Sequence, residues 1–420
     1  MNNRSLLVLL VACGLALAAI ALREGALLAL AIPFLSYLLV ALLHHQGSPQ
    51  LTALRRINRS SAVAGERVQV TLEIRNHGEA ISNLHVEDSL PSGAHKMVGS
   101  ARKSLCLDSS GTAEMTYSFK GVRGLCSWQG IGAVAADPLG LFETRMRISA
   151  PGEVIVRPTS LGIPRLPFRP LRTLHTAGPV SVPLPGSGTD FLDVREYRPG
   201  DPLRRINWRI SARHPGRLFT NEHQRHEAGD YGIILDARHA EDQVLERAVS
   251  AAASLAESIL SEGNRLSLLV FGKSMTAAFP GFGKRQLSLV LRSLAAAVRS
   301  PFVSLDYLEY FPRRLFPNRA VLLVISSVFP ADASMYARLR AAGHEILLVS
   351  PDPIEFATAG RKAPLSRNLA LRVARVERRA ALLSLSKLGV HIVDWQRDQP
   401  LQAALQATAP HLVHRRSLRD

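Results

Sequence analysis

Two long apolar runs begin the chain and predict a pair of membrane-spanning helices. Residues 6–22 and 25–43 are uncharged and almost wholly apolar, and only Arg23 and Glu24 separate them. Each run is long enough, at about 1.5 Å rise per residue, to cross the hydrocarbon core of a bilayer. A cleavable signal peptide would be followed by a cleavage region, whereas here the second run follows at once. We therefore expect residues 1–46 to form a transmembrane helical hairpin.

The charges on either side of the hairpin predict its orientation. Arg4 and the amino terminus precede the first run, and Arg55, Arg56 and Arg59 follow the second. Positive flanking charge favours the cytoplasmic side of a membrane. Both ends of the hairpin, and the bulk of the chain after it, are therefore expected to face the cytoplasm.

After the hairpin the apolar positions change to a period of two. They alternate with polar residues over 68–74, and shorter alternations recur at 84–86, 113–119 and 131–135. Short alternating stretches between turn residues are typical of half-buried strands. Residues 52–158 are therefore predicted to form a small antiparallel β-sandwich.

From residue 229 to residue 420, continuous apolar stretches alternate with segments of helical period. The apolar stretches are of the kind that is buried on both faces of a parallel sheet. Their order predicts a doubly wound α/β domain, which binds ligands at the carboxyl ends of its strands. The expected strands are 231–235, 266–271, 320–325, 345–349 and 390–393, and the expected helices include 245–259, 284–299, 331–342 and 366–388.

Between the two predicted domains, residues 159–228 read as a linker followed by an unusual charged segment. Prolines and glycines accumulate over 159–185, and residues 186–213 then combine arginines, carboxylates and aromatic residues. Asp201 and Pro202 have the form of a helix start, and this predicts a helix that carries a stripe of three arginines four residues apart. The stripe consists of Arg205, Arg209 and Arg213, and the nearby carboxylates are Asp190, Asp193, Glu196 and Asp201.

Three readings of this charged segment stay open. The first is an internal network of ion pairs that clamps the two domains. The second is a surface for an anion or an acidic partner, and the third is catalysis by one of the carboxylates. An alternation of Ile206, Trp208 and Ile210 also leaves a strand possible in place of the helix.

The same segment resembles a bacterial membrane-protein family named domain of unknown function fifty-eight. The members carry a long pattern of glycines, acidic residues, aromatic residues and arginines. The matching positions are Gly186, Gly188, Asp190, Phe191, Arg195, Tyr197, Gly200, Asp201, Arg205, Ile206, Asn207, Trp208, Ala212 and Arg213. The candidate interaction residues are Asp190, Arg195, Glu196, Tyr197, Gly200, Asp201, Arg205, Asn207, Trp208, Arg209 and Arg213.

This resemblance implies an architecture, a location and a partner. It implies a protein of the bacterial inner membrane with a von Willebrand factor A-like α/β domain. It also implies a partner of the MoxR type, an AAA+ ATPase, acting in the assembly or maturation of other complexes.

The loop after residue 235 resembles the first metal-binding loop of von Willebrand factor A-type domains. In those domains an Asp-x-Ser-x-Ser run holds a divalent cation, whereas this chain has Asp236-Ala-Arg238-His-Ala. Only the aspartate is retained. A hard cation needs about six oxygen ligands, so we expect no metal and no other cofactor. Asp236 is expected to pair with Arg238 or with an arginine of the charged segment.

The formal net charge of +17 raises the question of nucleic-acid binding. The arginines are scattered through every region, and no zinc-finger spacing or RNA-recognition motif occurs. A basic surface beside anionic lipid explains the charge as well. We therefore expect contact with the lipid bilayer and not with nucleic acid.

Taken together, the sequence predicts a membrane-anchored interaction protein that is not an enzyme and has no identified small-molecule substrate. The alternative is a hydrolase acting on an anionic substrate. In that reading Arg205 and Arg209 would hold the substrate, and Asp190 or Asp201 would act as the base.

Overall fold

The computed structural model describes residues 3–43, 49–91, 94–136, 141–163, 166, 180–238, 242–272, 275–300, 314–329, 332–358 and 365–414. The chain divides into two compact units, Met1–Arg157 and Pro158–Asp420. Each unit is described by itself below.

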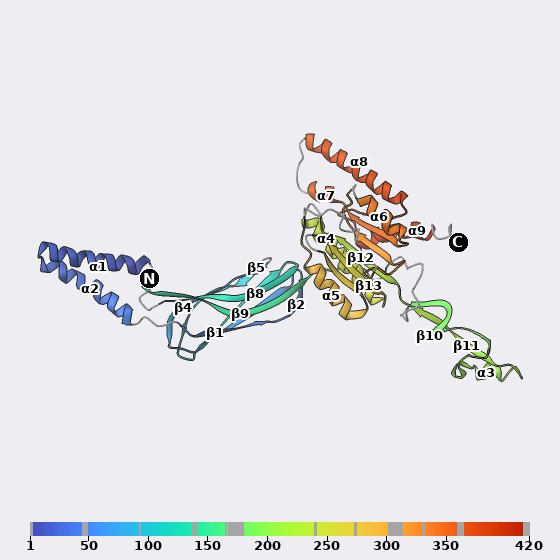
Figure 1. The fold of residues 1–420 in the computed structure, drawn as a ribbon, viewed down its shortest axis with the longest axis horizontal. Coiled ribbons are helices and arrows are strands. Elements are labelled where there is room, and N and C mark those ends of the chain that lie inside the picture. The colour runs from blue at the N-terminus through green and yellow to red at the C-terminus, as the bar shows by residue number, and fades with distance from the viewer. Residues whose placement is uncertain are drawn as a thin grey trace. The chain divides into compact units, whose positions relative to one another are not determined.

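Two apolar helices open the first unit (Figure 1). They are α1 (Asn3–Leu22) and α2 (Gly25–Leu43), and both contain an 18-residue apolar stretch that is long enough to cross a membrane. Their side chains are mostly exposed to the surroundings. A helix that is apolar all round and is not covered by protein is stable in lipid.

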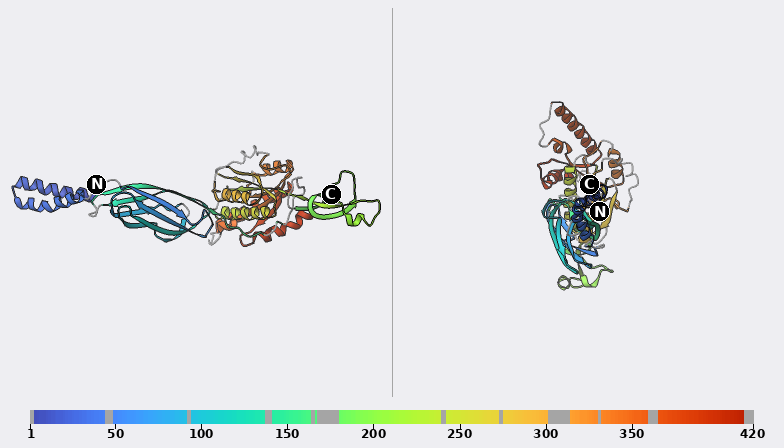
Figure 2. Two further views of the ribbon diagram at one scale, coloured as in Figure 1. Left: turned by 90° about the horizontal axis from the view of Figure 1, so that it is seen from below. Right: turned by 90° about the vertical axis from the view of Figure 1, so that its left-hand side faces the viewer.

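A β-sandwich-like region follows, as the alternating pattern predicts. One sheet has the order β1-β3-β7-β5 and the other the order β2-β9-β8-β4-β6. Figure 2 shows the long strands of this region side by side. The strands are β1 (Leu51–Ile57), β2 (Ser61–Val63), β3 (Arg67–Asn76), β4 (Ile81–Asp88), β5 (Ala94–Gly99), β6 (Arg102–Leu107), β7 (Thr112–Gly121), β8 (Gly124–Ala136) and β9 (Glu143–Arg157).

The residues at alternate positions of these strands form one core. Leu72, Phe119, Ile131 and Val154 come from both sheets and are fully buried in it. The pairing is antiparallel except between β2 and β9, which run parallel. Cys106 is exposed and Cys126 is buried, and both are free thiols.

Near the start of the second unit lies a β-hairpin, and the sequence analysis did not predict its first strand. Strand β10 (Val180–Glu196) pairs antiparallel with β11 (Phe219–Glu227), so a strand already begins within the segment expected as a linker. Upstream, Ile163 and Leu166 are buried in the core of the α/β domain. We call residues 180–227 the arm.

The continuous helix expected from Asp201 is wrong. A short 3-10 turn, η1 (Leu203–Arg205), and a single helical turn, α3 (Trp208–Ser211), stand in its place. Between them Ile206 is extended, with a ψ of 127°, because it forms a bridge to Thr220 at the edge of β11 and its side chain is buried. Arg205, Arg209 and Arg213 therefore do not form one helical stripe.

The α/β domain contains a sheet of the order β14-β13-β12-β15-β16-β17. All neighbouring pairs are parallel except β13 with β14, an edge strand absent from the prediction. The strands are β12 (Asp230–Asp236), β13 (Arg265–Phe271), β14 (Thr276–Gly281), β15 (Val321–Ile325), β16 (Glu345–Pro351) and β17 (His391–Trp395).

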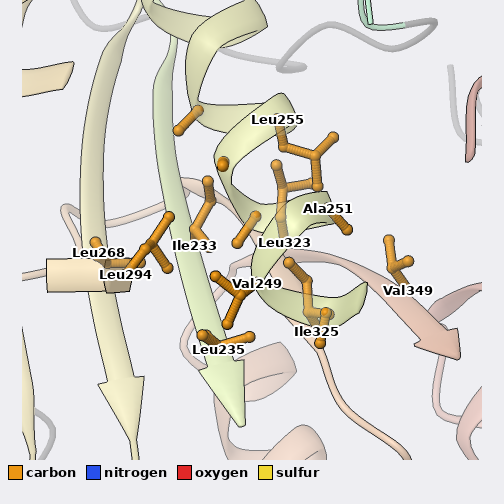
Figure 3. Close-up of a cluster of buried hydrophobic side chains, with 14 of the residues drawn as sticks. Ile233, Leu235, Val249, Ala251, Leu255, Leu268, Leu294, Leu323, Ile325 and Val349 are labelled. Atoms are coloured by element: carbon orange, nitrogen blue, oxygen red, sulfur yellow. The ribbon is translucent and has the colours of Figure 1, made fainter. Parts of the chain in front are cut away.

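Helices cover both faces of this sheet, because its strands are apolar on both sides. One face, shown in Figure 3, packs Ile233 and Leu235 against Val249 and Leu255. On the other face Ile234 packs with Tyr336 and other residues. The first face carries α4 (Asp242–Ser261), α5 (Gly283–Ala295) and α9 (Leu401–His414), and the second carries α6 (Ala333–Ala341) and α8 (Leu365–Lys387), with α7 (Pro353–Thr358) between α6 and α8 in sequence.

Candidate functional site

The strand order places one edge of the α/β sheet where ligands ordinarily bind. Strands β12 and β15 are neighbours, but the chain continues from β12 to β13 on one side and from β15 to β16 on the other. At such a reversal the connections diverge, and a crevice opens outside the carboxyl ends of the two strands. Asp236 is the last residue of β12, and Ser326 follows β15 directly.

An arginine occupies this position. Arg238 donates from Nε to Asp236 Oδ1 at 2.9 Å and from Nη2 to Asp236 Oδ2 at 2.8 Å. The backbone N–H of Arg238 also donates to Asp236 Oδ1, at 3.0 Å. Of the two partners expected for Asp236, the structure shows Arg238.

A second carboxylate and a hydroxyl complete the group. Nη2 of Arg238 donates to Asp332 Oδ2 at 2.9 Å, and Ser326 Oγ donates to Asp236 Oδ2 at 2.7 Å. We call Asp236, Arg238, Ser326 and Asp332 the ion cluster. Only 12% of the Arg238 side chain and 1% of the Asp332 side chain is exposed, so the cluster is a buried one.

Two aromatic rings enclose the guanidinium. The Cζ atom of Arg238 lies 5.3 Å from the ring centroid of Phe271 and 4.7 Å from that of Phe329. A cation over an aromatic face is stabilised, more so where water is excluded. Phe329 is itself 37% exposed, so its ring is both a cover for the cluster and part of the surface.

The protonation equilibria fit a closed ion cluster. Burial alone would lower the pKa of Arg238, but its bonds to Asp236 and Asp332 outweigh burial and raise that pKa, so the guanidinium stays charged. Burial raises the pKa of Asp332 even though Arg238 opposes the rise. Burial, and then the two carboxylates, raise the pKa of the Tyr336 phenol well above its usual value, so the phenol stays neutral.

The charged groups of this cluster are paired with one another. The carboxylates are engaged by a guanidinium, which is always charged and cannot accept a proton in turnover. Among the described residues, no group of three His, Cys, Asp or Glu side chains could hold a metal ion. The guanidinium of Arg238 bridges the carboxylates of Asp236 and Asp332, and its positive charge would repel a cation there, so the residues present do not fit a cation.

The loop after β15 is held in a strained conformation beside the cluster. Val328 has a φ of 62°, a left-handed value that is rare for a β-branched residue. Its backbone N–H donates to Ser326 Oγ, and the N–H of Phe329 donates to Asp332 Oδ2. Strain of this kind persists only where the surroundings impose it, and it is often found at functional loops.

The arm contains a second group of paired charges. Arg195 donates from Nη1 and Nη2 to the two oxygens of Asp201, both at 2.8 Å, and from Nε to Glu222 at 2.5 Å. The chain reverses between Arg195 and Asp201 in a turn that has Pro199 and Gly200 at its centre, with a φ of 109° at Gly200. Pro followed by a Gly of positive φ is the sequence of a type II turn.

Asp201 is therefore a structural carboxylate. It accepts three hydrogen bonds, two from Arg195 and one from the backbone N–H of Arg198. The hydrogen bonds from Arg195, and then that from Arg198, lower its pKa. A carboxylate with a lowered pKa is a poor general base, and the geometry gives no support to the role that the hydrolase reading assigned to Asp201.

The other candidate residues of the arm differ in their contacts and in their exposure. Asn207 caps α3 through its side chain, and the Trp208 side chain is 67% exposed. Arg209 and Arg213 are exposed, and Glu196 lies 3.9 Å from Arg217.

Tyr197 extends the hairpin by donating its backbone N–H to Leu218 O. Arg205 donates its backbone N–H to Pro202 O in η1, and Asp190 belongs to β10 with a side chain outside the described part.

Two residues of these groups were missed in the sequence. Asp332 precedes α6, where an aspartate is ordinarily read as a helix cap, but its carboxylate makes no capping bond and turns to Arg238 instead. Glu222 gave no signal because it lies 27 positions from Arg195. The sequence offered one clue to the ion pair at the carboxyl end of β12, namely that the buried strand ends in Asp236-x-Arg238.

The first unit has a buried ion pair of its own. Arg55 donates to both oxygens of Asp88, and neither side chain is exposed. Tyr117 donates its hydroxyl to Asp88 at 2.6 Å. Arg56 pairs with Glu73 and Arg59 pairs with Glu66. The three arginines expected as flanking charges of the hairpin are therefore engaged within the β-sandwich-like region.

Comparison with known proteins finds a family whose model matches part of the second unit. The model of the family described as Protein of unknown function DUF58 matches residues 193–363. The uncharacterized protein Rv1480 of Mycobacterium tuberculosis is 29% identical over 194 residues, which are 42% of this chain and 60% of that protein. The chain thus spans about three fifths of this relative's length. The uncharacterized protein YeaD of Bacillus subtilis is 27% identical over 274 residues, 63% of this chain and 67% of that protein.

Solved structures overlap a smaller part of the chain. The CARDB domain of the PF1109 protein from Pyrococcus furiosus is 12% identical, with a TM-score of 0.20, and covers 27% of this chain and 96% of that one. A FixG-related protein from Vibrio parahaemolyticus is 13% identical, with a TM-score of 0.19, and covers 26% and 98%. These overlaps are too low to define a shared fold.

The family match contains the two charge groups described above, from Arg195 of the arm to Asp332 of the ion cluster. Residues 193–363 of the chain therefore match the family described as Protein of unknown function DUF58.

Proposed function

We propose that this chain is a membrane-anchored interaction protein without enzymatic activity. In this proposal it works with a MoxR-type AAA+ ATPase in the assembly or maturation of other complexes. The observation that carries the proposal is the position of Arg238. The edge of the sheet where a doubly wound domain would bind a ligand is filled by a buried ion cluster. The outer surface of this edge is then available for a protein partner.

We further propose that the α/β domain is von Willebrand factor A-like and has replaced its cation by an arginine. Two features support this. Asp236 stands at the carboxyl end of β12, and the hydroxyl of Ser326 reaches it from the end of the neighbouring β15. In place of a metal, the guanidinium of Arg238 bridges Asp236 and Asp332. The loop is then held in its conformation permanently and does not depend on the cation supply.

The partner would dock on the loops at this edge. Val328 and Phe329 form the described part of the loop after β15, and hydrogen bonds to Ser326 and Asp332 fix both residues. A loop that is already ordered loses little conformational entropy on binding, which favours affinity. Phe329 supplies an exposed aromatic ring of the kind enriched at binding hot spots.

The two apolar helices would anchor the protein in a bacterial inner membrane as a multi-pass protein with its bulk in the cytoplasm. Support comes from the length and apolar composition of α1 and α2. An ATPase partner works where ATP is present, and this agrees with a cytoplasmic location of the domains.

Affinity purification of the tagged full-length chain from its native membranes in mild detergent, with mass spectrometry, tests the proposal. We expect an AAA+ ATPase to co-purify with the wild type and to be lost from Phe329→Glu. Phe279→Glu is the matched control, because Phe279 is an exposed phenylalanine on β14, at the edge of the same sheet. Recovery of no ATPase with the wild type, or equal loss from both variants, would contradict the proposal.

A further inference from the structure

Helix α8 has two apolar faces, and the described part of the chain covers one of them. Leu382 and Leu385 are buried in the core beneath the sheet. One turn before Leu382, Arg378 donates to Asp394 at 2.7 Å and to the Ser350 hydroxyl at 3.1 Å. This face, at positions 378, 382 and 385, attaches the helix to its domain.

The opposite face carries a second row of apolar side chains, which the described residues leave exposed. Leu369, Val373, Val376 and Leu383 are 64%, 50%, 69% and 57% exposed, and Ala380 between them is exposed as well. We call these five residues the α8 stripe. At about 100° per residue they lie on one side of the helix, half a turn away from the attached face. In Figure 1 and in the right panel of Figure 2, the amino-terminal end of α8 projects beyond the sheet.

The spacing of the stripe is that of a coiled-coil seam. The steps between its members are four, three, four and three residues, which is the a/d pattern of a heptad repeat. Val373 and Ala380 then take the a positions, and Leu369, Val376 and Leu383 take the d positions. A contiguous exposed apolar row of this length marks an interaction surface, because water otherwise contacts all of it.

The charges beside the seam select the occupant. Arg372 and Arg379 lie at the g positions, and Glu377 lies at an e position. In a parallel pair of identical helices, each g residue faces the e residue five positions further on in the other helix. Arg372 of one copy would therefore face Glu377 of the other, twice by symmetry. In an antiparallel pair, g residues face g residues, and the arginines would repel one another.

We propose that the α8 stripe joins two copies of this chain in a parallel two-stranded coiled coil. One a position is the β-branched Val373, and two of the three d positions are Leu369 and Leu383, a combination that favours two strands over three or four. The seam has only two heptads, a length at which an isolated helix pair is marginal. Anchoring both copies in one membrane, as proposed above, confines them and raises their effective concentration.

Cysteine cross-linking of the full-length chain in membranes tests the geometry. The background is Cys13→Ser with Cys106→Ser, because these two thiols are exposed and Cys126 is buried. Leu369→Cys is expected to give a disulfide-linked dimer on mild oxidation, since in a parallel pair position 369 faces itself. Arg375→Cys, exposed on the same helix but outside the seam, is the control and is expected to stay monomeric.

A charge exchange tests the pairing. Sedimentation of the detergent-solubilised protein should show two copies for the wild type and one for Val376→Glu. Because the Val376 side chain is largely exposed, the melting temperature of the Val376→Glu protein should equal that of the wild type. Glu377→Arg should weaken the dimer, and Arg372→Glu in the same chain should restore it.

Several outcomes would overturn the proposal. They are a monomeric wild type without cross-linking at position 369, cross-linking of Leu369→Cys only with Leu383→Cys (an antiparallel pair), and cross-linking of Arg375→Cys to the same extent. Capture of an acidic protein helix by a chain that stays monomeric would also overturn it. None of these readouts requires an ATPase, so loss of the dimer and loss of the ATPase partner are separate results.

Discussion

Arg238 and Asp236 form a bidentate pair at the end of β12, with Nε–Oδ1 and Nη2–Oδ2 distances of 2.9 Å and 2.8 Å. The two residues are only two positions apart in sequence, so the pair also closes the turn that follows the strand. The second carboxylate, that of Asp332, comes from a segment 94 positions later. One guanidinium thus ties together the turn after β12 and the start of α6.

Replacing Arg238 by glutamine should strongly destabilise the α/β domain. The change leaves two buried carboxylates without their positive partner, and breaking a buried pair in this way costs about 3–5 kcal/mol. The measurement is amide hydrogen exchange in β12 and β15 of the full-length protein. Arg285→Gln on α5 removes an exposed arginine and should leave exchange as in the wild type. Equal exchange in the two variants would show that the cluster does not hold the sheet edge.

The wild type should not respond to magnesium, whereas Arg238→Ser should. Without the guanidinium, the carboxylates of Asp236 and Asp332 and the Ser326 hydroxyl leave oxygen ligands of the type that magnesium prefers. A ligand that binds only the folded state raises the free energy of unfolding of the protein, and the rise grows with the logarithm of the ligand concentration. Melting temperatures with and without millimolar magnesium chloride make the test. A rise for the wild type alone would contradict the assignment of Arg238 to the cation position.

Asp332 should make stability depend on pH. Burial raises its pKa above the ordinary value of 3.8, so the folded state binds the proton more tightly than the unfolded state. The resulting stabilisation is complete below 3.8 and is lost as the pH rises through the raised pKa. The unfolding free energy of the wild type minus that of Asp332→Asn should therefore fall as the pH rises from 4 toward neutral, since asparagine does not titrate. A difference that increases over this range would show that Arg238 outweighs burial.

Much of this architecture could be predicted from periodicity, because burial alone dictates it. The fully apolar run at 231–235 becomes the central strand β12, and the alternating run at 68–74 becomes β3 of the β-sandwich-like region. The edge strand β14 was missed because periodicity reveals only strands with a regular pattern of burial. It is only partly buried, contains Pro280, and so lacks the continuous apolar pattern of the strands beside it.

The charged segment shows where local pattern fails. Its spacing favours a helix through Ile206, but Ile206 gains a bridge to Thr220 and a buried side chain, and this tertiary pairing overrides the helical preference of the short segment. The partners of Arg195 and Arg238 were out of reach for a related reason. Glu222 and Asp332 are far away in sequence, and only the folded chain brings them to their arginines.

Replacing Arg195 by lysine should loosen the turn of the arm. Lysine keeps the charge but cannot donate to both oxygens of Asp201 and to Glu222 at once. Amides of residues 198–206 should exchange several-fold faster, with no change in β12. Arg209→Lys on α3 is the control, since Arg209 is exposed. Unchanged exchange in the turn would indicate that charge alone, and not the planar fork, holds Asp201.

Replacing Arg55 by methionine should destabilise the β-sandwich-like region more than any exposed substitution there. The side chains of Arg55 and Asp88 are both fully buried, so the change leaves Asp88 as an unpaired buried carboxylate, at a cost of about 3–5 kcal/mol. Adding Asp88→Asn should recover more than half of this loss, because asparagine is neutral and still accepts the hydrogen bond from Tyr117. Hydrogen exchange in β3 and β7 follows the unit without interference from the second one. If the double variant were as unstable as Arg55→Met alone, the loss would come from the packing of Arg55 on Trp128, 5.0 Å from its ring centroid, and not from the charge.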